Sequence, residues 1–111
     1  QDATPSTSSS EWQLVTVSGS YVKIVNRASG LVVDVTKRLT ADGTPIQQWT
    51  DNGGTNQQWQ MVTVSGGYVK IVSRASGKVL NVSGSSTANG GNVTLSGDTG
   101  SSNQQWQVVG V

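Results

Sequence analysis

The stretch that decides the fold is NQQW, which occurs at residues 56–59 and again at residues 103–106. The two copies lie 47 residues apart, and the sequence around them repeats as well, with 26 identities when residues 12–58 are aligned on 59–105. A unit of this length cannot bury its apolar face alone and has to pack against further units. The repeat predicts unit one at 12–58, unit two at 59–105 and a terminal strand at 106–111.

Each unit has the pattern of short strands separated by turns. Runs rich in Val and Ile favour strands, and in unit one they occupy residues 12–17, 21–26, 31–35 and 45–49. Turn residues such as Gly30 and the Asp42-Gly43 pair stand between the runs, and Gly30 is placed to take a positive φ. No window carries a 3.6-residue apolar period long enough for a helix. The sequence therefore predicts an all-β fold with four strands per unit.

Composition excludes several classes of function. The chain has 111 residues, enough for one small domain, with a net charge of +1 and only 12% charged residues. No charge run points to nucleic acid or to a membrane surface. Cysteine and histidine are absent, and the acids are one Glu and five Asp. This set is poor for disulfides, metal binding and acid–base catalysis, so we expect no catalytic residue, no metal and no cofactor.

Residues 1–11 differ from the rest of the chain. They are small and polar, without periodicity, and they include Pro5 and a run of serines. Such a segment is typical of a linker, of a processed mature end, or of a stub of a missing unit. We expect the chain to belong to a secreted, extracellular protein.

The order of the motifs resembles the ricin-B-type lectins and the related carbohydrate-binding modules. The resemblance rests on the repeated Gln-x-Trp signature and on the YVKIV, RASG, VVDV or VLNV and IQQW stretches that precede it. It covers residues 12–111. It implies a β-trefoil, in which three four-stranded units surround a pseudo-threefold axis and form a six-stranded barrel with a triangular cap.

Differences between the two units separate scaffold from site. Trp12, Trp59 and Trp106 recur at the repeat spacing, and we interpret them as core residues where units meet. Tyr21 and Tyr68 recur too and are interpreted as scaffold.

Trp49 behaves differently, because its counterpart in unit two is Ser96. Identity is high before this region, with 18 matches in the first 24 positions of the unit, and then falls to 3 matches in the next 15. Two interpretations stay open: an unconstrained loop and strand, or a sugar-binding region in which Trp49 is the stacking platform.

A sugar site needs an aromatic ring for the C–H face of a pyranose, with fixed donors and acceptors at the edge of that ring. In the resembling family these roles fall on an Asp of the third strand, a Gln and an aromatic residue of the fourth, and the Asn before Gln-x-Trp. The resemblance therefore implies a site in unit one made of Asp34, Gln47, Trp49 and Asn56, with Gln57 beside it.

Unit two departs from this pattern. Asp34 is replaced by Asn81, while Gln47 and Trp49 are replaced by Thr94 and Ser96, so only Asn103 and Gln104 persist. We expect the second site to be weak or lost.

The resemblance favours a non-catalytic lectin or carbohydrate-binding module for galactose-type sugars. Arabinan or xylan binding, as a module of a polysaccharide hydrolase, is the alternative. A glycosidase using Asp34 and Asp51, and a protein-interaction trefoil, are the other classes considered.

The number of units raises one further expectation. Three 47-residue units do not fit into 111 residues, and two units alone leave strand edges and part of a barrel interior open. We expect either a homo-oligomer, in which six units from three chains form two trefoils, or a chain that is part of something longer.

Overall fold

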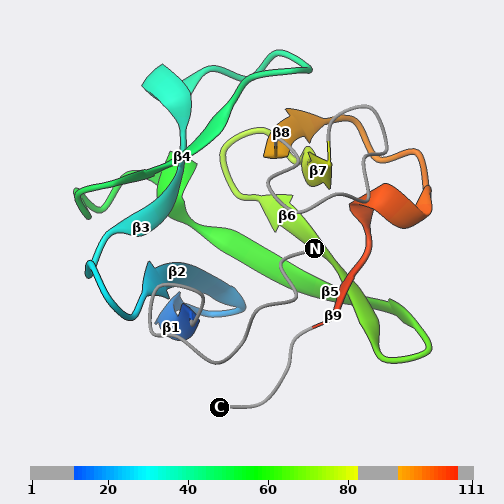
Figure 1. Cartoon of the computed structure of the whole chain (residues 1–111), viewed down its shortest axis with the longest axis horizontal. Coiled ribbons are helices and arrows are strands. Elements are labelled where there is room, and N and C mark those ends of the chain that lie inside the picture. Colours follow the sequence, from blue (N-terminus) through cyan, green and yellow to red (C-terminus); the bar gives the residue numbers. More distant parts are fainter. Residues whose placement is uncertain (1–11, 83–92, 108–111) are drawn as a thin grey trace.

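The computed structural model describes residues 12–82 and 93–107, and its regular structure consists of strands and short 3₁₀ turns (Figure 1). Each of the first two units supplies four strands and the terminal segment a ninth: β1 (Trp12–Ser18), β2 (Tyr21–Asn26), β3 (Val32–Val35), β4 (Ile46–Trp49), β5 (Trp59–Ser65), β6 (Tyr68–Ser73), β7 (Val79–Val82), β8 (Val93–Ser96) and β9 (Trp106–Gln107). The 3₁₀ turns are η2 (Thr36–Arg38), η3 (Thr55–Gln57) and η5 (Ser102–Gln104).

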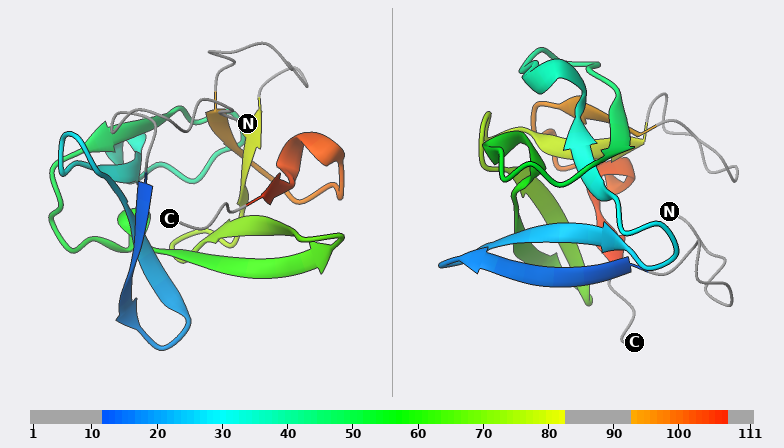
Figure 2. Two further views of the ribbon diagram at one scale, coloured as in Figure 1. Left: turned by 60° about the horizontal axis from the view of Figure 1, so that its bottom comes forward. Right: turned by 90° about the vertical axis from the view of Figure 1, so that its left-hand side faces the viewer.

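All strand pairings in the described residues are antiparallel, in the order β4-β3-β2-β5-β6-β7-β8. Strand β1 forms a hairpin with β2, and β9 pairs with β6. The sheet curls until its two ends approach each other, as the two views of Figure 2 show. A bridge between Pro45 and Thr94 joins these ends, with the Leu95 amide donating to the Thr44 carbonyl at 2.9 Å.

The two units join in the same way as unit two joins the terminal strand. Strand β5 pairs with β2 through Val22 opposite Trp59, and β9 pairs with β6 through Val69 opposite Trp106. The indole N–H of Trp59 donates to the Val33 carbonyl at 3.2 Å. That of Trp106 makes the same bond to the carbonyl 47 residues further on, at Leu80, also at 3.2 Å. Each tryptophan therefore ties the start of one unit to the third strand of the unit before it.

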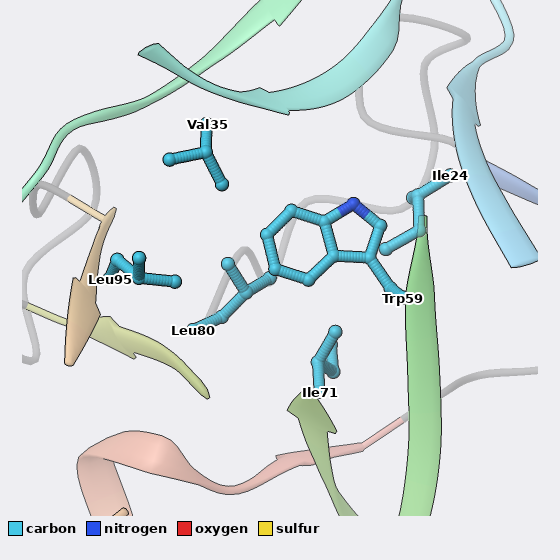
Figure 3. Close-up of a cluster of buried hydrophobic side chains, with 6 residues drawn as sticks. All are labelled: Ile24, Val35, Trp59, Ile71, Leu80 and Leu95. Carbon is cyan, nitrogen blue, oxygen red and sulfur yellow. The ribbon is translucent and has the colours of Figure 1, made fainter. Parts of the chain in front are cut away.

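The core lies where the units meet. Figure 3 shows Trp59 at its centre, surrounded by apolar side chains from both units. These buried side chains are Ile24, Val35, Ile71, Leu80 and Leu95. Trp59 itself is 0% exposed. Because unit one and unit two both contribute to this cluster, neither unit buries its apolar face without the other.

A second contact between the units lies at the surface. The Arg74 guanidinium stacks over the Tyr21 ring at 4.4 Å and donates to Gln58 Oε1 at 2.7 Å and to Ser18 Oγ at 3.1 Å. A cation over an aromatic face is attracted by the ring quadrupole. This contact agrees with the interpretation of Tyr21 as scaffold.

The predicted all-β class is confirmed, and the expected strands occur within one residue of their predicted bounds in unit one. Gly30 takes the predicted positive φ, at 74°. Trp12 and Trp106 pack against the core cluster, as predicted, but they are half-buried, unlike Trp59. Tyr68 is 42% exposed.

Some expectations lie outside the described residues. These concern residues 1–11, predicted as linker or stub, and all but the first two residues of the terminal strand at 106–111. In the part of the chain that is described, no helix has the length and apolarity to span a membrane.

Candidate functional site

The β3–β4 hairpin of unit one brings the predicted side chains to one face. In its register Asp34 lies opposite Gln47, and Val32 lies opposite Trp49. Opposed residues of an antiparallel pair point to the same side, and every second residue of a strand does so. The carboxylate, the amide and the indole are therefore neighbours on one face of the hairpin.

Asp34 is the most enclosed member of this group, at 3% exposure. Its Oδ1 accepts a hydrogen bond from Gln47 Nε2 at 3.0 Å. Its Oδ2 accepts one from Asn56 Nδ2 at 3.1 Å and one from Gln57 Nε2 at 2.9 Å. A buried carboxylate is tolerated when its oxygens are hydrogen-bonded. Three amide donors satisfy this requirement, and Oδ1, with a single partner, keeps acceptor capacity.

The exposure of the side chains separates those that a ligand can reach from those that hold the site together. Trp49 is 54% exposed and Gln47 is half-buried. Asn56 and Gln57 are 4% and 1% exposed. The structure thus brings all five predicted residues together, with Trp49 and Gln47 at the surface and the other three beneath.

Asn56 and Gln57 have further partners that explain their burial. Asn56 Nδ2 also donates to the Val35 carbonyl at 3.1 Å. Gln57 Nε2 also donates to the Thr50 carbonyl at 2.9 Å, while its Oε1 accepts from the Asn52 amide at 2.9 Å. These bonds fasten turn η3 to both strands of the hairpin. The two amides therefore set the position of the Asp34 carboxylate.

Unit two repeats this arrangement without the carboxylate and without the indole. Asn81 Oδ1 accepts from Asn103 Nδ2 at 3.0 Å and from Gln104 Nε2 at 3.2 Å. Asn81 Nδ2 in turn reaches Thr94 Oγ1 at 3.4 Å, the counterpart of the Gln47 contact. Ser96 stands in the place of Trp49. The network of amides is thus common to both units, whereas the carboxylate and the aromatic ring belong to unit one alone.

One feature beside the site was not predicted. In turn η2, which follows strand β3 directly, Lys37 and Arg38 have φ values of 53° and 58°. Residues with a Cβ rarely adopt this left-handed conformation, which costs about 1–2 kcal/mol per residue. The sequence does carry a signal for it, because the counterparts in unit two are Gly84 and Ser85.

Gly54 lies beside three polar side chains, one of them Arg38. The φ of Gly54 is −72°, which any residue adopts, so its backbone conformation does not require glycine. A Cβ at this position would lie 2.5 Å from Asn56 Oδ1, 3.0 Å from Asn52 Oδ1 and 3.1 Å from Arg38 Nη2. Glycine is favoured chiefly because the buried amide of Asn56 approaches so closely. Asn56 Oδ1 is itself buried and accepts no hydrogen bond from the described residues.

The remaining described carboxylates are paired with lysines. Lys23 lies 2.7 Å from Asp51, Lys70 lies 2.7 Å from Asp98, and Lys78 lies 2.8 Å from Asp42. In each case the hydrogen bond from the lysine holds the pKa of the carboxyl below its usual value. Within residues 12–82 and 93–107, no three acidic side chains gather in the way that a metal site requires.

Two surface hollows occur at equivalent places in the units, and Trp49 lines neither of them. Lys23 and Asp51 line the one in unit one, together with Gln57, and Lys70 and Asp98 line the one in unit two, together with Gln104. Since these lining residues recur in both units, whereas the carboxylate of Asp34 and the ring of Trp49 do not, we assign the hollows to the shared scaffold.

The family comparison agrees with this geometry. The model of the ricin-type β-trefoil lectin domain-like family matches residues 8–96 and, in a second overlapping match, residues 55–111. A comparison with curated protein sequences gives no match.

Solved structures give the same fold. A designed three-fold symmetric protein, ThreeFoil, is 43% identical with a TM-score of 0.87, over 90% of this chain and 71% of that one. An exo-β-1,3-galactanase from Clostridium thermocellum is also 43% identical, with a TM-score of 0.91, over 95% of this chain and 23% of that one. A lectin of Polyporus squamosus, 24% identical with a TM-score of 0.74, shares the fold over 86% of this chain and 34% of its own length. The chain belongs to the ricin-type β-trefoil lectin domain-like family.

Proposed function

We propose that this chain binds carbohydrate without catalysis, at a shallow site in unit one that takes galactose-type sugars. The observation that carries the proposal is the position of Trp49, exposed on the same hairpin face as Gln47, with the buried Asp34 carboxylate beneath Gln47. The C–H face of the sugar packs on the indole of Trp49. Its hydroxyls bond to Gln47 and to Asp34 Oδ1, while Asn56 and Gln57 hold the carboxylate in place.

Galactose suits this arrangement because its axial O4 and its O3 form a vicinal pair: one hydroxyl donates to the remaining lone pair of Asp34 Oδ1 and the other bonds to Gln47. A site with one aromatic ring and a few hydrogen bonds binds weakly, at roughly millimolar to high micromolar Kd. The galactanase neighbour, as its name states, acts on a β-1,3-galactan. Arabinan or xylan binding, as a module of a polysaccharide hydrolase in an extracellular setting, is the alternative.

Catalysis by this chain is disfavoured by the state of its acids. A glycosidase needs one carboxyl with a raised pKa as general acid, paired with a second carboxylate at the scissile bond. Lys23 lowers the pKa of Asp51 by donating a hydrogen bond to it, and Asp34 is enclosed by three amide donors. Hydrolysis of a sugar that disappears in Asp34→Asn would overturn this part of the proposal.

The Trp49→Ala variant tests the site. We expect this variant to lose retention on immobilised galactose and to bind galactose at least about tenfold more weakly. The reason is that packing of the sugar ring on the indole supplies much of the binding free energy of a weak site. Titration with galactose, lactose, arabinose and xylose, followed by tryptophan fluorescence, gives the affinities and identifies the sugar. We expect one binding site per chain, because unit two lacks both ring and carboxylate.

The control is Ser96, the counterpart of Trp49 in unit two. Ser96→Ala should leave affinity and stoichiometry unchanged, and both variants should retain the wild-type unfolding transition. Unchanged galactose retention in Trp49→Ala would remove Trp49 from the site. Tight binding to a protein with no binding on a glycan array would instead favour a protein-interaction trefoil.

We further propose that a third unit completes the barrel, supplied by other copies of this chain or by a longer chain that contains it. The support lies in the tryptophans. The N–H of Trp59 and that of Trp106 bond to the preceding unit, whereas the N–H of Trp12 has no acceptor among the described residues. Light scattering tests assembly: six units from three chains predict three times the 11.5 kDa of one chain. A well-folded 11.5 kDa monomer would exclude the trimer.

A further inference from the structure

Turn η2 places two cations beside the proposed sugar site, and we propose that they select anionic sugars, namely pyranoses that carry a carboxylate or a sulfate group. The inference rests on the proposed carbohydrate function and concerns the substrate class of that same site. The cations are Lys37 and Arg38, the third and fourth residues after Asp34.

The first argument is proximity. Arg38 Nη2 and Asn56 Oδ1 lie 3.1 Å and 2.5 Å from the same point above Gly54. The amide of Asn56 donates to Asp34 Oδ2 at 3.1 Å on its other side. The guanidinium therefore lies near Asn56, whose amide also contacts the Asp34 carboxylate.

The second argument is charge balance. Lys23, Lys70 and Lys78 each have an aspartate partner, and Arg74 lies over Tyr21. Lys37 and Arg38 are exposed and have no carboxylate partner among the described residues. With Asp34 counted as −1, the edge of the site carries a formal charge of +1. An anionic substituent on the sugar would give Lys37 the kind of ion pair that every other described lysine already makes with an aspartate.

The third argument is backbone strain. Both residues are held at positive φ, 53° and 58°, where glycine is the favoured residue. Unit two, which lacks the sugar-type residues, has Gly84 at the first of these positions. Strained conformations that persist with large polar side chains concentrate at functional sites. A purely structural turn would be more stable with glycine, so the lysine at this position needs another reason.

The fourth argument comes from the comparison of the units within this chain. Arg38 and Gly54 occur together in unit one, and both are replaced by serine in unit two, at Ser85 and Ser101. The space above Gly54 is shared by the side chains of Asn56, Asn52 and Arg38, so the glycine leaves room for the arginine beside the two amides. Arg38, with its left-handed turn, and Gly54 therefore occur in the same unit as the carboxylate of Asp34 and the indole of Trp49, and neither residue recurs in unit two.

The test compares three probes: methyl β-galactoside, galacturonate and galactose 6-sulfate. We expect the wild-type chain to bind at least one anionic probe about tenfold more tightly than the neutral galactoside at low salt, as expected for charges a few ångströms apart near a protein surface. The advantage should shrink at 0.5 M NaCl, because salt screens exposed charges. Binding of galacturonate but not of the sulfate, or the reverse, identifies the anion.

Two variants assign the effect to the turn. Lys37→Gly and Arg38→Gln should each reduce the anion preference about threefold or more while changing the affinity for the neutral galactoside less than about twofold. Lys37→Gly should also raise the melting temperature by about 4 °C, because it relieves the left-handed backbone. The matched control is Lys70→Gln, which removes a cation from unit two and should leave the anion preference unchanged.

The outcomes separate the two proposals. If no probe perturbs tryptophan fluorescence, the proposed function fails and this inference fails with it. If methyl β-galactoside binds but neither anion binds more tightly, or if Lys37→Gly and Arg38→Gln keep the full preference, this inference alone is overturned.

Discussion

Replacing Trp59 with alanine is expected to lower the free energy of unfolding by about 4 kcal/mol, within the range for large aromatic residues in a core. Trp59 is 0% exposed and contacts apolar side chains of both units. Its N–H bond to the Val33 carbonyl, at 3.2 Å, is lost as well. Domains of this size are stable by only about 5–15 kcal/mol, so such a loss removes a large share of the total. Urea denaturation followed by circular dichroism measures it.

The other tryptophans of the chain provide matched controls. Trp106→Ala should cost about half as much, since Trp106 is half-buried and makes the equivalent bond to Leu80. Trp49→Ala should change stability by less than about 0.5 kcal/mol, as expected for an exposed side chain. Equal losses for Trp59→Ala and Trp49→Ala would contradict the separation of scaffold from site.

Replacing Asp34 with alanine is expected to cost about 2–3 kcal/mol of stability and to abolish sugar binding. The substitution leaves Gln47, Asn56 and Gln57 without the acceptor they share, and a buried donor without a partner costs about 1–3 kcal/mol. Each of the two buried amides keeps a second acceptor, at Val35 or Thr50, and Gln47 can turn towards solvent. For this reason the expected loss of stability is smaller than the sum for three buried donors left without any acceptor.

Asp34→Asn separates the two effects, because unit two already contains this version of the site. Asn81 accepts from Asn103 and Gln104 at 3.0 and 3.2 Å, so a neutral amide fits the same network. We expect Asp34→Asn to cost less than about 1 kcal/mol but to weaken sugar binding at least about tenfold, because charge-assisted hydrogen bonds are roughly twice as strong as neutral ones. Thermal unfolding and galactose titration of both variants check this. Wild-type affinity in Asp34→Asn would remove the carboxylate from the binding step.

Much of this architecture could be predicted from the sequence because the 47-residue unit occurs twice, so each strand and turn signal is seen in two copies. Strand bounds follow from β-branched runs and from turn residues such as Gly30, which are local signals. The grouping of Asp34, Gln47 and Trp49 follows from the two-residue period of strands once β3 and β4 are paired. The resemblance to a known family supplied that pairing.

The features that escaped prediction depend on contacts between distant parts of the chain. The burial of Asp34 follows from turn η3, which brings in an amide 22 residues away. The positive φ of Lys37 is not indicated by the propensity of lysine, and only the comparison with Gly84 of unit two carries a signal for it. Spacing in sequence cannot rank the burial of three tryptophans with the same local motif.

The position of Trp59 has a consequence for how such chains are recombined. The repeat boundary at residues 58–59 lies directly before the core tryptophan that contacts both units, so a cut made there separates Trp59 from the Val33 carbonyl and from Ile24 and Val35 of unit one. The exposed turn at Gly66–Gly67, between β5 and β6, interrupts no core contact. An evolutionary exchange or an engineered circular permutation of these modules would therefore preserve folding best with its joint in that hairpin turn, about eight residues after the point where the sequence begins to repeat itself.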